Sequence, residues 1–489
     1  MHQLSNLETE VKYRQEKSTK PNTKDNETNI ISKQEDHSGD AGNKQDDHYK
    51  KKLSPIRYKL RSLLLPLIRY ETDLLFNLQT LLRNPIFDFY FAWTANLASH
   101  TFYVLMLPPA NWFGGSKLAR DLVHVLGLGI YFTGFLKDYF CLPRPRSPPL
   151  HRITMSSYTT QEYGFPSSHS ANATAVTLVV LTSIINIKDA FNSTTYYSLI
   201  IGLSIYYISL IFGRLYCGMH GFLDILVGSS VGVLVFLFRH YLGEWWDDLI
   251  LGHGMTFGII AITSVFLFLI HIYSEPVDDC PCFDDSVAFV GVLMGLDFSH
   301  LIARSTKYFY NIDNYGDYYR VPFNVESGLI ILGLRFIIGV TLVVIWKTIS
   351  KPIIFTILPP IYKFVGVYLP RKNYISTAFT NQTTRNIRST SISNDVSQIG
   401  NINNFIKGVS DRQKLDNIGP SSDIDYYEMI DYNRKNDLSN NVDPDKYNFK
   451  SGVFKYRYDV EIIGRLIVYA GVAFTAIWGF YFVSNYLQI

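Results

Sequence analysis

The chain has 489 residues, a formal net charge of +3 and a mean hydropathy of +0.06. So small a charge does not indicate nucleic-acid binding, and the basic residues form no stripe interleaved with aromatics. The four cysteines are too few for a disulfide-rich scaffold. Residues 1–50 hold no apolar stretch, so we expect no cleavable signal peptide and infer that internal apolar segments direct the chain to a membrane.

Polar residues are concentrated in two tracts, which we predict to be disordered because they cannot bury enough apolar surface to offset the entropy of ordering. The first is the tail formed by residues 1–50, and the second is the loop formed by residues 371–457. Residues 51–84 instead mix Leu, Ile and Phe with Arg and Lys. This mixture predicts a basic amphipathic helix on the membrane surface, with a soluble helix packed on the core as the alternative.

Apolar stretches near the roughly 20 residues needed to cross a bilayer make up most of the remaining chain. Only helices satisfy so many backbone groups in lipid without the alternating pattern of a barrel. We therefore predict an all-α, polytopic membrane protein. Its predicted spans are 86–108, 119–136, 171–187, 196–212, 222–238, 254–273, 286–303, 327–346, 353–369 and 462–484.

These spans divide into a catalytic helical core at 85–242, additional transmembrane helices at 243–370 and a last transmembrane helix within 458–489. Two spans carry Asp88, His100, Asp297 and His300, which are costly in lipid. We expect these side chains to face the interior of the bundle or to mark a span that is only partial.

Three polar clusters lie at span ends. The first runs from Lys137 to Pro145, the second is Pro166-Ser167-Ser168-His169, and the third runs from Arg214 through His220 to Asp224. Counting the intervening spans places all three on one face of the membrane. Cleavage of a phosphate monoester needs such a convergence of cations, a nucleophile and an acid.

Lys137, Arg144 and Arg214 are the predicted cations for the phosphate oxygens. Ser167 and Ser168 precede a helix, so their hydroxyls and the free N–H groups of its first turn predict an anion site. Any one of these cations by itself would more often be a membrane-interface anchor. Only the occurrence of all three cations together with the serines and histidines favours a phosphate site.

The two histidines complete the predicted site. One imidazole can attack phosphorus while the other protonates the leaving oxygen. We assign His220 as the nucleophile because Asp224, four residues later on one helix face, can accept a hydrogen bond from the other ring nitrogen. His169, which has no acidic residue at that spacing, is assigned as the acid. No carboxylate cluster suggests a metal, and the C-P-C spacing of Cys280 and Cys282 is not that of a usual zinc site.

The three clusters resemble the type 2 phosphatidic acid phosphatase superfamily, whose signatures are K-x6-R-P, P-S-x-H and S-R-x5-H-x3-D. The resemblance implies a helical core of that type, metal-free chemistry without a cofactor, and a phosphohistidine intermediate. It gives the same roles to the residues named above. The one departure is Gly213, which stands where the third signature usually has Ser.

Flanking residues resemble more closely the sphingosine 1-phosphate and long-chain base phosphate phosphatases. The most diagnostic segment lies outside the signatures, at Cys280-Pro-Cys-Phe-Asp-Asp-Ser-Val-Ala-Phe289. This resemblance implies an endoplasmic reticulum enzyme that hydrolyses dihydrosphingosine, phytosphingosine or sphingosine 1-phosphate. The sequence defines no oligomeric state.

Alternatives remain at this stage. The phosphate cradle does not read the lipid tail, so phosphatidate or a polyprenyl pyrophosphate could be the substrate. Glu162, by its position alone, could meet a sphingoid ammonium group. A transporter or lipid-binding regulator could keep the clusters as an anion site, although both histidines would then be unnecessary. A vanadate-dependent haloperoxidase has a similar cradle, but those proteins are soluble.

The sequence leaves the topology partly open. A lumenal site follows from the family resemblance and from placing the polar tract at 371–457 in the cytosol. The same count puts the basic N-terminal segment on the face of the motifs, against the positive-inside tendency. We therefore expect one span before residue 137 to be miscounted.

Overall fold

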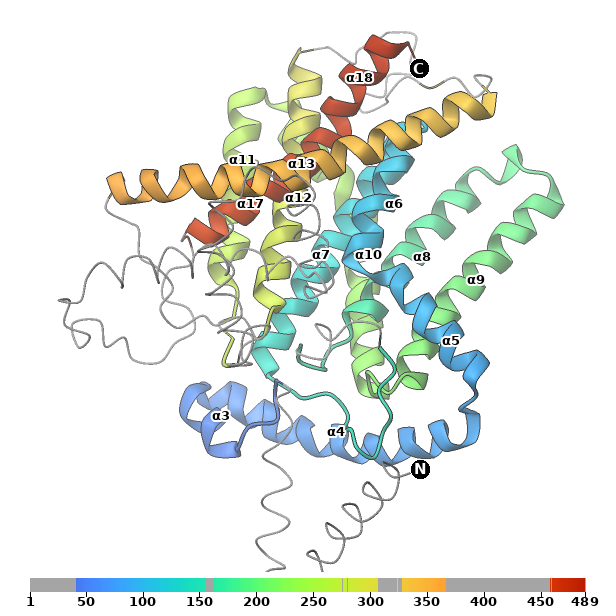
Figure 1. Ribbon diagram of the computed structural model, residues 1–489, viewed down its shortest axis with the longest axis vertical. Coiled ribbons are helices and arrows are strands. Elements are labelled where there is room, and N and C mark those ends of the chain that lie inside the picture. Colours follow the sequence, from blue (N-terminus) through green and yellow to red (C-terminus); the bar gives the residue numbers. More distant parts are fainter. Residues whose placement is uncertain are drawn as a thin grey trace, which may run out of the picture. The chain divides into compact units, whose positions relative to one another are not determined.

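The computed structural model of the protein describes residues 41–154, 162–274, 276–278, 280–306, 323, 328–365, 458 and 460–488. Within these residues the chain forms helices and loops and no strand, which confirms the predicted all-α class (Figure 1). The predicted disordered loop at 371–457 and residues 1–40 of the tail predicted at 1–50 lie outside the described residues.

Four helices carry the three motifs: α7 (Ser116–Phe140), α8 (Ser168–Asn186), α9 (Ser193–Tyr216) and α10 (Phe222–Gly252). Helix α8 packs against α7, α9 and α10. Its approach to α10 depends on two glycines of α10. A Cβ atom at Gly228 would lie 2.4 Å from the carbonyl oxygen of Ser167, and one at Gly232 would lie 2.3 Å from that of Ala171. These glycines therefore bring the N-terminus of α10 beside that of α8.

A second group of helices packs on the far side of α7. It contains α11 (Met255–Ile272), α12 (Cys282–Thr306), α17 (Val460–Phe474), the short η7 (Thr475–Gly479) and α18 (Phe480–Leu487). Helix α12 lies between α7 and α17 (Figure 1). Gly295 of α12 permits close packing, because a Cβ atom there would lie 2.1 Å from the carbonyl oxygen of Ala470.

Seven described helices are long and apolar enough to cross a membrane, so the protein is a multi-pass membrane protein. They are the helices that cover Ser168–Asn186, Ser193–Tyr216, Phe222–Gly252, Met255–Ile272, Cys282–Thr306, Gly328–Leu358 and Ile462–Leu487.

The predicted spans outside these seven took other forms. The stretch at 86–108 is broken into α5 (Pro85–Thr94), the 3-10 turn η1 (Ala95–Ala98) and α6 (His100–Trp112), in line with the expectation of a partial span. The stretch at 119–136 is a continuous helix, α7, whose ends carry several charged residues, among them Lys117 and Lys137.

The separate spans predicted at 327–346 and 353–369 are wrong. Their described residues, 328–346 and 353–365, belong to one helix, α13, which runs from Gly328 to Val365. Lys347 and Lys351 lie between the two predicted spans and interrupt the apolar pattern. Lysine is a good helix former, however, so a polar interruption does not end a helix.

The N-terminal segment is more ordered than the sequence predicted. A short helix, α3, covers Asp46–Lys52 and so begins within the last residues of the tail predicted at 1–50. Tyr49 is fully buried, and its hydroxyl donates a hydrogen bond to Asp278 Oδ2 at 2.6 Å. The contact partner lies 229 residues away in the chain. Local composition therefore could not reveal that this end of the tail is anchored.

Helix α4 (Pro55–Leu82) is the helix predicted at 51–84, and it runs across the end of the bundle that carries the motifs (Figure 1). Arg57 Nη2 donates to the carbonyl oxygen of Asp138 at 2.6 Å, and Gln79 Nε2 donates to that of Tyr216 at 2.9 Å. The basic segment therefore does lie on the motif face. Helices α5 and α6 together lead from this face to the start of α7 (Figure 1), and none of these three helices is among the seven above. The expectation of a miscounted span before residue 137 stays a prediction.

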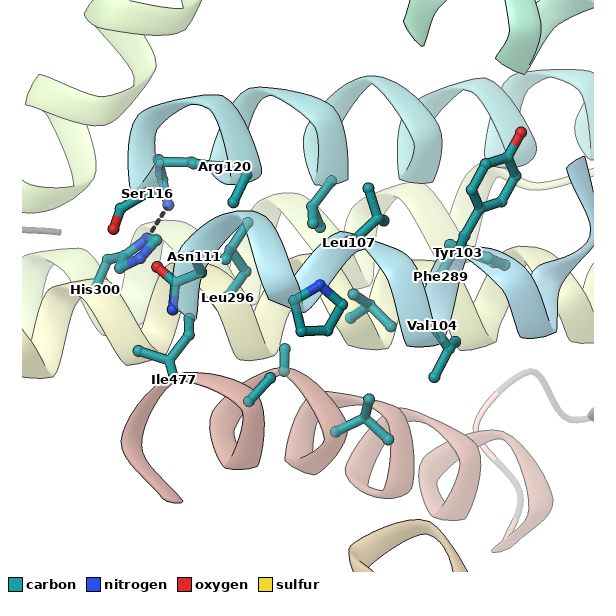
Figure 2. A pocket seen from close by; sticks show the side chains of 17 residues that line it. Tyr103, Val104, Leu107, Asn111, Ser116, Arg120, Phe289, Leu296, His300 and Ile477 are labelled. Atoms are coloured by element: carbon teal, nitrogen blue, oxygen red, sulfur yellow. Dashed lines mark hydrogen bonds between the residues drawn. The ribbon is translucent and has the colours of Figure 1, made fainter. Parts of the chain in front are cut away.

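An apolar cavity of about 60 Å³ lies among α6, α7, α12 and the η7 region (Figure 2). Ser116, Asn111, Arg120 and His300 gather at one end of it, and the remaining wall is largely aliphatic and aromatic. Arg120 and Lys137 are both on α7, about 25 Å apart at 1.5 Å per residue. The cavity end at Arg120 is therefore remote from the motifs.

Candidate active site

The three sequence motifs are joined at one end of the bundle by hydrogen bonds to the backbone. The amide of Gly164 donates to the carbonyl oxygen of Leu142 at 2.9 Å, which connects the first motif to the second. The amide of Ser167 donates to the carbonyl oxygen of Asp224 at 3.0 Å, which connects the second to the third. Arg144 Nη1 reaches the carbonyl oxygen of Met219 at 2.9 Å. The predicted convergence of the motifs is therefore present.

His220 lies in the centre of this cluster and is 1% exposed. Its Nδ1 is 2.9 Å from the carbonyl oxygen of Gly164, and its Nε2 is 3.1 Å from Arg144 Nη1. A carbonyl oxygen only accepts and a guanidinium only donates. Nδ1 therefore carries the proton, and the lone pair of Nε2 faces the cationic side of the site.

Asp224 is close to His220, but it is not the nearest acceptor. Its Oδ2 lies 3.6 Å from Nδ1 and accepts a hydrogen bond from the amide of Gly221 at 2.8 Å. The carboxylate thus caps the first turn of α10 and places a negative charge beside the ring. The prediction that Asp224 accepts the ring N–H is wrong for this structure, because the carbonyl oxygen of Gly164 takes that place.

Gly164 was not recognised from the sequence. A Cβ atom there would lie 2.7 Å from the Cα atom of Arg144, so the chain needs glycine for this close approach. The one feature of the sequence that could have indicated this role is the position of the glycine, two residues before the P-S-x-H signature. Which carbonyl oxygen faces the imidazole depends on the loop path, and spacing alone does not give that.

His169 is the second residue of α8 and is partly exposed. Burial is the main cause that lowers the pKa of His220 well below 6.5. The next causes are the charges of Arg144, Lys137, Arg214 and His169, in that order. All four predicted partners therefore lie close enough to act on the imidazole of His220, which stays neutral.

The three predicted cations are buried around one small volume. Lys137, near the C-terminus of α7, contacts Glu162 Oε2 and lies 3.3 Å from Ser168 Oγ. Arg144 also approaches the Glu162 carboxylate, with 3.8 Å between Nη2 and Oε2. Burial lowers the pKa of Arg144 to about 10, so it remains a cation at neutral pH.

Arg214 approaches from the last turn of α9 and is 5% exposed. Its Nε atom is buried without a hydrogen-bond partner among the described residues. A buried guanidinium with an unsatisfied donor is costly, and an anion in the site would satisfy it.

The two serines have different positions. Ser167 is the N-cap of α8, where its Oγ accepts from the amide of Ser170 at 3.3 Å and from the hydroxyl of Ser170 at 3.0 Å. Ser168 begins the helix and is the serine that faces Lys137. The first-turn amides of α8 point to the same end as the cations, as expected for an anion site.

The glycine that departs from the family signature has a local explanation. A Cβ atom at Gly213 would lie 3.0 Å from Cδ1 of Phe91 in α5. The aromatic ring occupies the space that a serine side chain would need. Gly213 and Phe91 are therefore matched to each other.

Glu71 of α4 is a further residue near the site that the sequence did not indicate. Its Oε1 accepts from the amide of Leu223 at 2.9 Å, so it caps α10 from another helix. A Cβ atom at Gly221 would lie 2.0 Å from Glu71 Oε2. Burial raises the pKa of Glu71. Helix α4 thus supports the turn that carries His220.

In the described part of the chain, one group of side chains has the residue types and spacing of metal ligands. It consists of Asp138, Cys280 and Cys282. The two cysteines form a disulfide, so neither offers a thiolate. This group therefore does not fit a zinc site.

Comparisons with known proteins agree with this geometry. A family model of the PAP2 superfamily matches residues 118–248. Dihydrosphingosine 1-phosphate phosphatase of Schizosaccharomyces pombe is 33% identical over 86% of this chain and 88% of its own length. A dihydrosphingosine 1-phosphate phosphatase of Saccharomyces cerevisiae is 40% identical over 66% and 78%, and mouse sphingosine-1-phosphate phosphatase 2 is 28% identical over 58% and 78%. No solved structure matches the chain.

Proposed function

Because this chain belongs to the PAP2 superfamily, we propose that it removes the phosphate group of sphingoid base 1-phosphates through a phosphohistidine intermediate. The protein is a membrane-embedded phosphoric monoester hydrolase. The observation that carries the mechanism is the unprotonated Nε2 of His220, which faces three buried cations. The substrate class follows the names of the relatives, two of which are dihydrosphingosine 1-phosphate phosphatases.

In the first half-reaction, Lys137, Arg144 and Arg214 hold the phosphate oxygens. His220 Nε2 attacks phosphorus, an N–P bond forms, and the bond from phosphorus to the lipid oxygen breaks. His169 gives its proton to that oxygen, and the free sphingoid base leaves as an alcohol. The carbonyl oxygen of Gly164 and the charge of Asp224 stabilise the ring when it becomes cationic.

In the second half-reaction, His169 takes a proton from water, and the resulting hydroxide attacks phosphorus from the side opposite Nε2. The N–P bond breaks, inorganic phosphate is released, and His169 is again protonated for the next cycle. The cations balance the phosphate charge in both steps, so no metal enters the mechanism.

Phosphate release from purified, reconstituted protein tests this proposal. The panel is dihydrosphingosine 1-phosphate, phosphatidate and farnesyl pyrophosphate, with excess chelator present throughout. We expect turnover of the first substrate, none by His220→Ala, and a loss of roughly 10²–10⁴-fold in His169→Ala. An acid-labile phosphoenzyme should be trapped in the wild type and absent in His220→Ala. Full turnover by His220→Ala would overturn the mechanism. Faster turnover of phosphatidate or farnesyl pyrophosphate would show that the proposed substrate class is wrong.

We place the enzyme in the endoplasmic reticulum membrane with the site toward the lumen, which rests on the resemblance to the sphingoid base phosphatases. The connection between α8 and α9, which includes Lys188–Ala190, lies at the end of the bundle opposite the motifs. A protease site inserted there should be cleaved in sealed microsomes. A site inserted between α3 and α4 should be protected, and the reverse pattern would invert the topology.

A further inference from the structure

Glu162 places a carboxylate inside the phosphate cradle. Its Oε2 contacts Lys137 Nζ and lies 3.8 Å from Arg144 Nη2, and its side chain is only 12% exposed. Burial lowers the pKa of Arg144, and the charge of Glu162 opposes that shift. The backbone carbonyl oxygen of Glu162 accepts from Arg144 Nε at 3.1 Å, which fixes the residue at the rim of the site.

A carboxylate in this position occupies part of the space that the substrate phosphate needs. Cations that bind phosphate also bind carboxylate, and a phosphate dianion carries the greater charge. A phosphate that takes Lys137 and Arg144 therefore competes with Glu162 for both of its ion-pair partners. A largely buried carboxylate that loses its partner is strongly destabilised. Binding of a simple phosphate thus carries a cost that comes from Glu162.

A sphingoid base 1-phosphate carries an ammonium group that can replace the lost cation beside Glu162. The phosphate ester is on carbon 1 and the ammonium group is on carbon 2, so both charges reach the rim of the cradle together. We propose that Glu162 binds this ammonium group after the phosphate has displaced it from Lys137. This proposal rests on the proposed function and names a specificity-determining residue for it.

The exchange replaces the ion pairs of Glu162 with Lys137 and Arg144 by ion pairs of the phosphate with these two cations, and it adds a new pair between the ammonium group and Glu162. Phosphatidate and alkyl phosphates form only the phosphate pairs and supply no cation of their own to the carboxylate. Glu162 therefore selects by favouring the amine-bearing lipid and by opposing the others. Tail contacts are not needed for this discrimination.

Glu162→Gln tests the proposal with two single-chain substrates, dihydrosphingosine 1-phosphate and octadecyl phosphate, which lacks the amine. The variant keeps the size of the side chain and loses its charge. We expect kcat/KM for the amine-bearing lipid to fall by about tenfold to a hundredfold, the range for a hydrogen bond to a charged group. Octadecyl phosphate should be hydrolysed as well as by the wild type or faster. Equal losses for both lipids would overturn the proposal.

Competition by inorganic phosphate gives a second readout that a purely structural residue would not produce. Removal of the competing carboxylate should lower the inhibition constant of phosphate in Glu162→Gln, whereas damage to the cradle would raise it. Glu162→Asp, which keeps the charge, should retain preference for the amine-bearing lipid. A raised constant in Glu162→Gln, or loss of preference in Glu162→Asp, contradicts the proposal.

The matched control is Glu244→Gln, which removes the same charge from an exposed carboxylate that pairs with Lys117 near the far end of α7. It should leave both kcat/KM values unchanged. Failure of the proposed function is separable, since a wild-type protein that hydrolyses neither lipid refutes the phosphatase. A wild type that hydrolyses both equally well refutes only the role of Glu162.

Discussion

Helix α7 carries two buried polar clusters, one near each end, and they differ in how their charges are matched. At the end away from the motifs, Arg120 Nη2 lies 2.6 Å from Asp247 and 2.7 Å from Asp297. Arg239 completes the pairing with Asp247 at 2.6 Å. At the other end, Lys137 and Arg144 share the carboxylate of Glu162 at the rim of the cradle, and Arg214 lies near enough to feel its charge.

The difference distinguishes a structural cluster from a binding site. In the Arg120 cluster each guanidinium meets carboxylates directly, so it joins α7, α10 and α12 without needing a ligand. In the active site the Nε atom of Arg214 is buried with no partner among the described residues. Burial of unmatched positive charge costs stability, and a phosphate would remove that cost. The unsatisfied donor of Arg214 therefore favours the motif end as the anion-binding cluster.

The largest expected difference between the two clusters comes from replacing one arginine of each by methionine. Arg214→Met should lower kcat/KM on the order of 10²–10³-fold, as for loss of one donor to a developing anion, with little change in thermal stability. Arg120→Met should instead cost about 3–5 kcal/mol of stability, because it leaves the fully buried Asp297 without its guanidinium partner. Phosphate release and thermal unfolding in detergent measure both. Equal loss of stability in the two variants would remove the distinction.

A second prediction concerns pH and the unmatched cations. Burial and these cations lower the pKa of His220 well below 6.5, so the ring releases its proton more readily in the folded than in the unfolded protein. Its contribution to stability is therefore present above pH 6.5 and is lost as the pH falls through the folded-state pKa. The acid limb of kcat/KM should lie below pH 6.5 and move upward in Arg214→Met. An acid limb at or above pH 6.5 in the wild type would contradict this.

The smallest expected effect tests the packing beside Arg214. Gly213→Ser should cost about 1–3 kcal/mol, because the added side chain meets the ring of Phe91. Phe91→Leu in the same chain should recover most of that loss. The measurement is the midpoint of thermal unfolding for both single variants and the double variant. Additive losses would show that Phe91 is not the obstacle.

The amount that could be predicted differs between the two clusters. Spacing alone located Lys137, Arg144, Arg214 and the two histidines, because the motifs place them at fixed distances from span ends. The sequence flagged Asp297 and His300 as costly in lipid but did not reveal Arg120 as their partner, since α7 and α12 meet only after the bundle assembles. The role of α4 was missed for the same reason, because Glu71 and Gln79 act on backbone groups of distant residues.

The sequence by itself determined the helical membrane architecture, the position of the three motifs at span ends and the residue types that we propose to bind phosphate. These depend on hydrophobic length and on short-range spacing, which are properties of the linear chain. Only the tertiary structure decided which acceptor holds the ring of His220, that Glu162 lies among the cations, and that Gly213 faces Phe91. Such contacts join segments far apart in the chain, and the packing of whole helices sets them.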